Sequence, residues 1–127
     1  MIVLDASVLI AHLDRDDAHH AAARKRLLEL ADHQFGASEL TVAEVLVAPT
    51  RTGALASAQR ALADLALAEL ALPPSAPARL AALRVDTGLK LPDCCVLLAA
   101  EAHAGSVLTF DERLAREATR RGVGLDP

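Results

Sequence analysis

The sequence predicts an α/β fold with a central, mainly parallel β-sheet flanked by helices. Short apolar runs alternate with longer helical patterns along the chain, as expected when helices connect parallel strands. The length of 127 residues argues for one domain over residues 1–127. A hydrophobic content of 53% favours a packed core. An aromatic content of 2% makes that core aliphatic, and it disfavours folds that bind RNA mainly by base stacking, such as the RRM.

The N-terminal half begins with a buried strand at Ile2–Leu4, a short β-branched and aliphatic run. A helix is expected over Ala6–Leu13. A longer helix is expected over residues 16–33, where two aspartates at the start favour the positive end of the helix dipole. Residues 33–38 predict a second short strand. A helix over residues 38–48 then ends near a proline, which interrupts helical hydrogen bonding.

The second half of the chain continues the same alternation of helices and strands. An alanine-rich amphipathic pattern marks its first helix, a pair of prolines closes its first strand, and a proline favours the first turn of its third helix. In order, the expected elements are a helix over residues 54–67, a strand over 69–72, helices over 75–86 and 92–103, a strand over 105–110, a helix over 111–121 and an edge strand over 123–125.

The net charge of −4 and the pI of about 5.7 give no bulk argument for nucleic-acid binding. Such binding would require the acids to gather around cations while arginines line the rim. The start "MIVLDASVLIAHL" is interrupted by Asp5 and has no basic segment before it, so it does not resemble a secretory signal. Apolar runs stay below the roughly 18 residues that a spanning helix needs. The sequence therefore predicts a cytoplasmic protein without membrane association.

Two side-chain clusters suggest metal ligands but have simpler explanations. Cys94 and Cys95 are adjacent on a predicted helix, where neighbours point about 100° apart, so they are poorly placed to pair or to share a metal. Without further cysteines a cysteine-based zinc site is not expected, and both are interpreted as small buried hydrophobes in a reducing compartment. Asp16 and His19 have a spacing that suits a transition metal, but the start of an exposed helix explains them better.

Four acids occupy positions that point to a common site. Asp5 and Asp111 each follow a predicted strand, so in a parallel sheet they share one edge. Glu44 and Asp93 are expected in the first turns of helices that begin at that same edge. Four converging carboxylates would repel and raise one another's pKa. Mg²⁺ or Mn²⁺, which prefer oxygen ligands, would remove this conflict, and two such ions would offset four negative charges.

Each of these acids also has an ordinary structural explanation. Asp5 suits the N-cap of the helix that follows it. Glu44 forms a capping-box pattern with Thr41. Asp93 and Asp111 suit the first turn or the cap of a helix, where an acid gains about 0.3–1 kcal/mol from the dipole. No single position decides between these explanations and a metal site.

The combination of four segments resembles a known family. "MIVLDAS", "SELTVAEVL", "LKLPDCCVLLAA" and "SVLTFDERL" are similar, in this order, to the motifs of PIN-domain nucleases, and most of all to VapC-type toxins of toxin–antitoxin pairs. The resemblance covers nearly the whole chain and implies a single PIN-like domain. It also implies an Mg²⁺- or Mn²⁺-dependent endoribonuclease. The implied metal-binding and catalytic residues are Asp5, Glu44, Asp93 and Asp111, and the implied supporting hydroxyls are those of Ser7 and Thr109.

The resemblance further implies a reaction and partners. A metal-activated water would attack an RNA phosphodiester, and the sequence has neither a GxSxG motif nor a P-loop to suggest another mechanism. The implied partners are tRNA or rRNA as substrate, a VapB-like antitoxin and a second copy in a homodimer. The apolar surplus of residues 40–48 and 54–72 is compatible with such an interface. Candidate phosphate contacts, each of which also suits a solvated surface, are Arg15, Arg51, Lys90, Arg113 and Arg116.

Three alternative functions fit the sequence less well. A PIN-like scaffold could bind RNA or protein without cutting, although no acid of the quartet is missing. A phosphoacceptor receiver domain would place an acidic pair at the first strand, whereas Asp5 has no acidic neighbour. A haloacid-dehalogenase-like phosphatase would need a second acid where this chain has Ser7.

Overall fold

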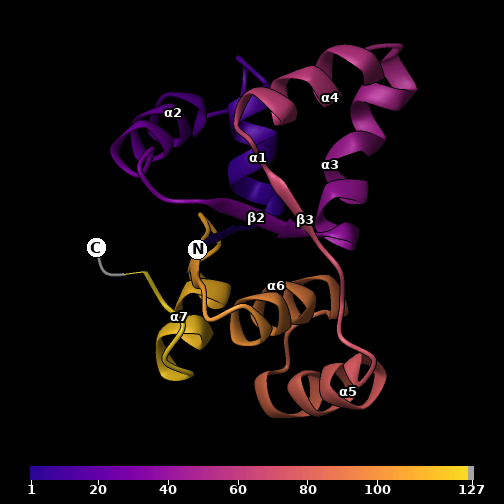
Figure 1. Ribbon diagram of the computed structural model, residues 1–127, viewed down its shortest axis with the longest axis vertical. Helices are drawn as coiled ribbons and strands as arrows, with labels where there is room; N and C mark the ends of the chain where they lie inside the picture. Colours follow the sequence, from indigo (N-terminus) through magenta and orange to yellow (C-terminus); the bar gives the residue numbers. More distant parts are fainter. Residues whose placement is uncertain (126–127) are drawn as a thin grey trace.

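Four short parallel strands form the centre of the protein in a computed structural model, which describes residues 1–125 (Figure 1). Their order in the sheet is β3-β2-β1-β4, and every neighbouring pair is parallel. The predicted α/β fold with a mainly parallel sheet is therefore confirmed. The strands are β1 (Ile2–Leu4), β2 (Phe35–Ser38), β3 (Ala68–Leu70) and β4 (Ser106–Leu108).

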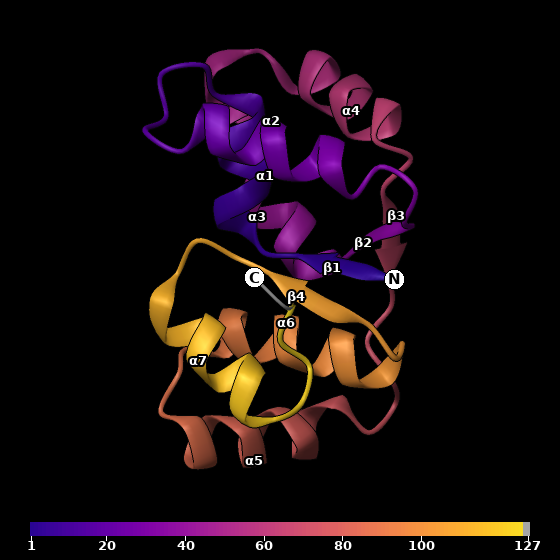
Figure 2. The same cartoon turned by 90° about the vertical axis from the view of Figure 1, so that its left-hand side faces the viewer.

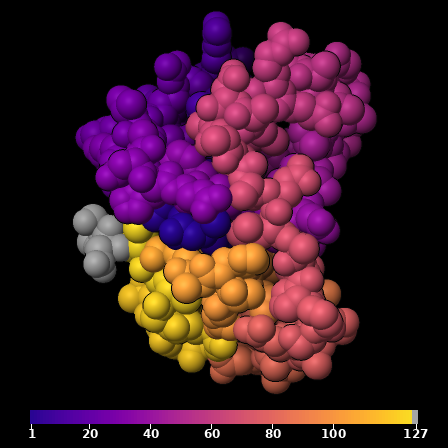
Figure 3. All heavy atoms as spheres, viewed as in Figure 1, coloured from indigo at the N-terminus to yellow at the C-terminus, as the bar shows by residue number. Residues whose placement is uncertain are grey.

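Helices cover both faces of this sheet, as a sheet that is buried on both sides requires (Figures 1 and 2). One face carries α1 (Ala6–Leu13), α2 (His20–Glu29), α3 (Glu39–Thr52) and α4 (Leu55–Asp64). The other face carries α5 (Ala76–Thr87), α6 (Leu91–Ala102) and α7 (Glu112–Arg120). The space-filling view shows the N-terminal helices above the C-terminal ones, with the indigo start of the chain between them (Figure 3).

The core has one apolar cluster on each face of the sheet. Ile2 and Leu4 point into the cluster under α1, α2 and α3, whereas Val3 points into the cluster over α5, α6 and α7. Helix α6 lies in the centre of the second cluster, and its residues 94–100 are all buried. Both cysteines belong to this buried run and are free thiols, as expected for small core residues.

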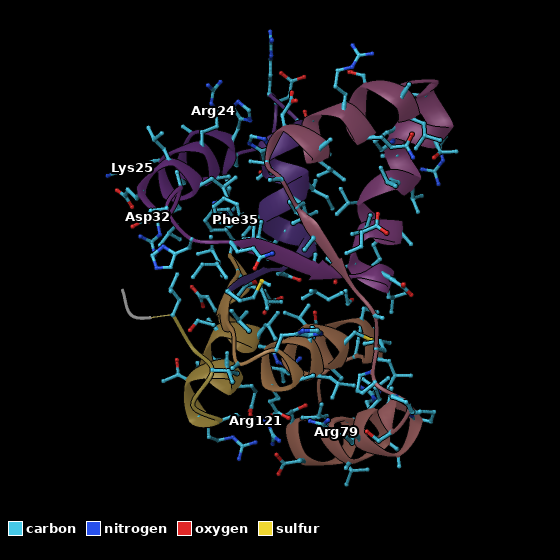
Figure 4. The ribbon with its side chains drawn as sticks, in the orientation of Figure 1. Arg24, Lys25, Asp32, Phe35, Arg79 and Arg121 are labelled. Carbon is cyan, nitrogen blue, oxygen red and sulfur yellow. The ribbon has the colours of Figure 1, made fainter. Side chains whose placement is uncertain are left out.

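An ion-pair network joins the three helices of the second face. Glu101 of α6 accepts from Arg121 Nε at 2.7 Å and pairs with Arg79 of α5 at 3.4 Å. Figure 4 shows Arg79 and Arg121 at the base of the molecule. Asp86 of α5 binds Arg121 at 2.9 Å and Arg120 at 2.7 Å. Because these pairs are exposed or partly exposed, each contributes little to the free energy of unfolding, and together they mainly fix the helix positions.

Helix α2 starts at His20, so the prediction of a start at residue 16 was wrong. The preceding aspartates form local turns instead of a first helical turn. Asp14 Oδ1 accepts from the backbone N–H of Asp16 at 2.9 Å, and Asp17 Oδ1 accepts from that of His19 at 2.8 Å. Aspartate side chains compete with helical hydrogen bonding in this way.

Other predicted boundaries also differ from the structure, among them the end of α2, which lies at Glu29 and not at residue 33. Helix α3 continues through Pro49 to Thr52 and ends at Gly53, which has a positive φ of 78°. Pro49 removes a single hydrogen bond, near the end of the helix, and does not stop it. The predicted edge strand over residues 123–125 is reduced to one bridge between Gly124 and Val107.

The strand order creates a switch point between β1 and β4. The chain moves outward from β1 to β2 and β3, and then returns to place β4 on the other side of β1. In Figure 2 both strands run towards the left, where α1, α6 and α7 begin. Open parallel sheets bind ligands beyond the carboxyl ends of their strands at such a point. Within the described residues, no helix combines the length and apolarity needed to cross a membrane.

Candidate active site

Asp5 lies at the switch point, where hydrogen bonds fix its side chain. The residue follows β1, is 7% exposed and caps α1. Its backbone N–H donates to Leu108 O at 3.0 Å, which joins the carboxyl ends of β1 and β4. Ser7 Oγ and Thr109 Oγ1 each donate to Asp5 Oδ2 at 2.7 Å. Oδ1 receives no hydrogen bond from the part of the chain that the structure describes.

The two hydroxyl groups connect Asp5 to the segment that follows β4. Ser7 Oγ accepts from the backbone N–H of Phe110 at 3.1 Å, and Thr109 Oγ1 accepts from that of Asp111 at 3.0 Å. Each hydroxyl has one proton, which it donates to Asp5, so the 3.3 Å between the two hydroxyl oxygens is not a further hydrogen bond. The predicted supporting residues therefore orient the Asp5 carboxylate and the chain leading to Asp111.

Asp111 caps α7, and its carboxylate borders a small pocket. Its Oδ1 accepts from the backbone N–H of Leu114 at 2.9 Å, so the ordinary capping explanation is correct for this residue. The carboxylate is exposed, and it lines a pocket of about 230 Å³. The other residues that line this pocket are Leu89, Lys90, Asp93 and Arg113.

Asp93 lies in the first turn of α6, on the other side of this pocket. Burial raises its pKa above the ordinary value of 3.8, and the carboxylates of Asp5 and Asp111 raise that pKa further. Lys90 and Arg113 oppose the rise. A helix dipole alone would lower the pKa of a first-turn acid. At Asp93, lost hydration and the two carboxylates therefore outweigh Lys90 and Arg113, and the net direction of its pKa is upward.

Glu44 approaches the same carboxylates from α3. Burial raises its pKa above the ordinary value of 4.5, and Asp5 and Asp93 raise it further. Because the residue as a whole is exposed, this loss of hydration is partial. The capping-box explanation is wrong, since Ser38 caps α3 by accepting from the backbone N–H of Thr41 at 3.2 Å. Glu44 instead lies in the second turn of the helix.

Two of the five predicted phosphate contacts lie at this site. Lys90 and Arg113 are exposed, line the pocket and act on the charge of Asp93. Arg15 lies in the turn before α2. Arg51 lies seven residues beyond Glu44, about 10 Å along α3. Arg116 lies one turn beyond Arg113 on α7. Within the described residues 1–125, these last three arginines are not among those that line the pocket between Asp93 and Asp111.

The donor set matches a hard divalent cation, although the carboxylates are spread apart. Within residues 1–125, no three acidic, histidine or cysteine side chains are close enough to form a ready-made ligand group. Mg²⁺ keeps several waters and commonly uses only one or two carboxylates, so it does not need a closed cage. The unbonded Oδ1 of Asp5 and the carboxylates of Asp93 and Asp111 are oxygen donors of the type it prefers. The chemistry of the residues therefore fits such an ion.

One aromatic contact beside the site could not be predicted from the sequence. The imidazole of His19 stacks on the ring of Phe110, with ring centres 4.7 Å apart and planes inclined by 14°. In the sequence, His19 was notable only for its spacing from Asp16. One feature of the sequence could have pointed to this contact. Phe110, one of two phenylalanines in the chain, lies between the predicted site residues Thr109 and Asp111.

Comparison with protein families gives one match that spans most of the chain. The family model described as "PIN domain" matches residues 2–119. No curated protein matches the sequence.

Several solved structures share the fold. A toxin–antitoxin complex from Klebsiella pneumoniae contains a similar chain at 26% identity and a TM-score of 0.73, with 87% of each chain covered. Mycobacterium tuberculosis VapC20, a toxin that cleaves the sarcin–ricin loop, is similar at 16% identity and a TM-score of 0.76, with 92% of this chain and 95% of that chain covered. VapBC2 from Rickettsia felis, bound to a promoter DNA fragment, is similar at 14% identity and a TM-score of 0.71, with 98% of this chain and 96% of that chain covered.

Proposed function

Since the chain belongs to the PIN domain family, we propose that it is an endoribonuclease toxin that requires Mg²⁺ or Mn²⁺. The observation that supports this proposal is that Asp5 and Asp111 are close enough to Asp93, at the switch point of the sheet, to raise its pKa. Lys90 and Arg113 line the same pocket as Asp93 and Asp111. Glu44 is the fourth acid, and it shares charge repulsion with Asp5 and Asp93.

The side chains divide the proposed reaction between them. Asp5, Glu44, Asp93 and Asp111 are the proposed metal-binding and catalytic residues. When bound, a divalent cation supplies a nucleophilic water at neutral pH and stabilises charge on the phosphodiester. Ser7 and Thr109 hold Asp5 in one orientation, which lowers the reorganisation needed during the reaction.

Phosphate binding is the proposed role of Lys90 and Arg113. Both are exposed at the pocket that Asp93 and Asp111 line, so a phosphate there would lie between basic and acidic groups. Their positive charges also reduce the repulsion between the acidic site and an RNA backbone. Arg15, Arg51 and Arg116 are proposed as outer contacts for a longer RNA, where exposed basic side chains steer association.

The proposed partners follow from the same family membership. The similar structures include toxin–antitoxin complexes, so a VapB-like antitoxin is the proposed inhibitor. A homodimer is proposed through α3, where Leu40 and Val47 are 40% and 52% exposed. The substrate is proposed to be tRNA or rRNA, which places the activity in the cytoplasm.

A PIN-like scaffold that binds RNA or protein without cutting is the alternative function. It is favoured by the open spacing of the carboxylates, which do not form a ready-made ligand group within residues 1–125.

Cleavage of total tRNA and rRNA by the purified chain, freed of any antitoxin, tests the proposal. The wild type is assayed with Mg²⁺, with Mn²⁺ and with EDTA, beside Asp93→Asn and the distant control Asp64→Asn. We expect cleavage that is lost with EDTA and in Asp93→Asn but kept in Asp64→Asn. Cleavage that survives Asp93→Asn would reject the site, and a folded chain that cleaves nothing with either metal would favour the scaffold.

A further inference from the structure

We propose that the His19–Phe110 stack is a platform for an unpaired RNA base beside the phosphate-binding pocket. This proposal rests on the proposed function and adds to it the kind of nucleotide that the site accepts. It assigns His19 a role in specificity that neither its sequence position nor its place at the start of α2 suggests.

Phe110 is fixed at the site by its neighbours in the chain. Thr109 binds Asp5 and Asp111 lines the pocket, so the residue between them lies within about 4 Å, Cα to Cα, of each. The backbone N–H of Phe110 donates to Ser7 Oγ at 3.1 Å. Its ring packs against the apolar cluster under α1 and α2, so it forms the inner layer of the stack.

His19 forms the outer layer of the stack. Its backbone N–H donates to Asp17 Oδ1 at 2.8 Å and its backbone O accepts from the N–H of Ala23 at 2.8 Å, which fixes the residue before α2. One face of the imidazole contacts Phe110, while the residue as a whole is exposed to solvent. An exposed aromatic ring that is supported on one face by a second ring is an arrangement on which a base can stack.

The stack is not needed to hold the turn before α2 in place. The turn before α2 is already closed by backbone and side-chain hydrogen bonds from Asp14 and Asp17. The chain has neither tryptophan nor tyrosine, and its other phenylalanine, Phe35, is 6% exposed in the core. Apart from histidines, the partly exposed aromatic residue of this protein is therefore Phe110, and it lies next to the acidic site.

The surrounding charges favour a base over a phosphate at this position. Asp14, Asp16 and Asp17 outnumber the single cation Arg15 in the turn before His19, so this turn carries a net negative charge that repels the RNA backbone. Lys90 and Arg113 attract the RNA backbone at the pocket that they line with Asp111. A nucleotide with its phosphate in the pocket and its base on His19 satisfies both preferences. Bases inside a duplex are already stacked on one another, so this arrangement requires an unpaired nucleotide.

Binding of short labelled RNAs, followed by fluorescence anisotropy, tests the platform without cleavage. The parent protein carries Asp93→Asn, and Mg²⁺ is present throughout. It is compared with three variants of this parent, which additionally carry His19→Ala, His19→Leu or His19→Phe. The probes are a single-stranded RNA, the same RNA with one abasic position, and a blunt duplex. Circular dichroism and thermal melting establish that each variant is folded.

We expect His19→Ala and His19→Leu to weaken single-strand binding about 5- to 100-fold, while His19→Phe restores it. Duplex binding should be weak and unchanged by all three substitutions. The platform is overturned if folded His19→Ala binds the single strand as tightly as its parent, or if His19→Leu binds as well as His19→Phe.

The outcomes also separate the platform from the proposed function. Wild-type cleavage with unchanged RNA binding in His19→Ala would keep the nuclease and overturn the platform. RNA binding that depends on an aromatic residue 19, in a chain that never cleaves, would keep the platform and overturn the nuclease. A folded parent that binds no RNA would overturn the platform.

Discussion

Asp5 combines two roles that its position in the sequence left as alternatives. The residue caps α1, and its Oδ2 also accepts the protons of Ser7 and Thr109. A cap needs only one accepting oxygen, which leaves Oδ1 for a different ligand. At residue scale, capping and metal binding are therefore compatible uses of the same carboxylate.

Replacement of Thr109 by valine tests how much its hydrogen bond to Asp5 stabilises the fold. The change keeps the shape but removes one proton donated to Asp5 and the acceptor of the Asp111 N–H. Hydrogen bonds to charged groups contribute about 1.5–3 kcal/mol, so we expect the free energy of unfolding to fall by about 1–3 kcal/mol. Urea denaturation measures this change, and Thr119→Val on the outer end of α7 is the control. Equal stability of Thr109→Val and the wild type would show that the contact is not stabilising.

The raised pKa values of Glu44 and Asp93 predict a pH-dependent stability in the absence of divalent cations. Both groups lose a proton more readily in the unfolded chain, so their contribution is fully present below the ordinary values of 4.5 and 3.8. It is lost as the pH rises through the higher folded values. We therefore expect Asp93→Asn to raise the melting temperature at pH 7 by a few degrees and to have a smaller effect near pH 3.

Thermal melting in EDTA at both pH values measures this difference. Addition of Mg²⁺ should raise the melting temperature of the wild type and leave that of Asp93→Asn nearly unchanged. A lower melting temperature for Asp93→Asn at pH 7 in EDTA would mean that Asp93 acts mainly as a helix-start acid.

At the scale of elements, sequence patterns located every helix and strand of the sheet but not all of their ends. Helix α1 was predicted with both ends correct, because Asp5 is a strong cap and the strand before it is short. The start of α2 was predicted wrongly, because aspartates suit both a helix start and the local turns that they form here. Long-range contacts such as the stacking of His19 on Phe110 leave no periodic pattern in the sequence.

Pro49 provides a test of the extended α3. A proline inside a helix costs about 3 kcal/mol, part of which is offset because proline restricts the unfolded chain. We expect Pro49→Ala to raise the free energy of unfolding by about 1–2 kcal/mol, measured by urea denaturation. Pro73→Ala, in a segment outside the helices and strands, is the control. A loss of stability in Pro49→Ala would show that the proline fits the native backbone better than alanine does.

At the scale of the whole molecule, the strand order brings the site together. Asp5 and Thr109 are 104 positions apart in the sequence, yet hydrogen-bonded neighbours beyond adjacent strands. The sequence predicted this common edge, because alternating strands and helices imply a parallel sheet. It could not predict how far apart the carboxylates lie, since that distance depends on how α3 and α6 pack.

The exposed apolar side of α3 predicts self-association. Val47 is 52% exposed beside Ala43, so a second copy would bury it in the proposed homodimer. We expect Val47→Asp to convert a dimer into a folded monomer, measured by sedimentation velocity. Val85→Asp on α5, where the valine is 87% exposed, is the matched control and should remain dimeric. A monomeric wild type at micromolar concentration would contradict this interface.

Cation binding at the switch point is tested most directly by calorimetric titration with Mn²⁺. The wild type, Asp93→Asn and the distant control Asp64→Asn are compared at pH 7. We predict that the wild type and Asp64→Asn bind Mn²⁺ with similar affinity, and that Asp93→Asn binds it at least about tenfold more weakly, a loss of about 1.4 kcal/mol. Equal binding by Asp93→Asn, or no binding by the folded wild type, would contradict a metal site formed by these carboxylates.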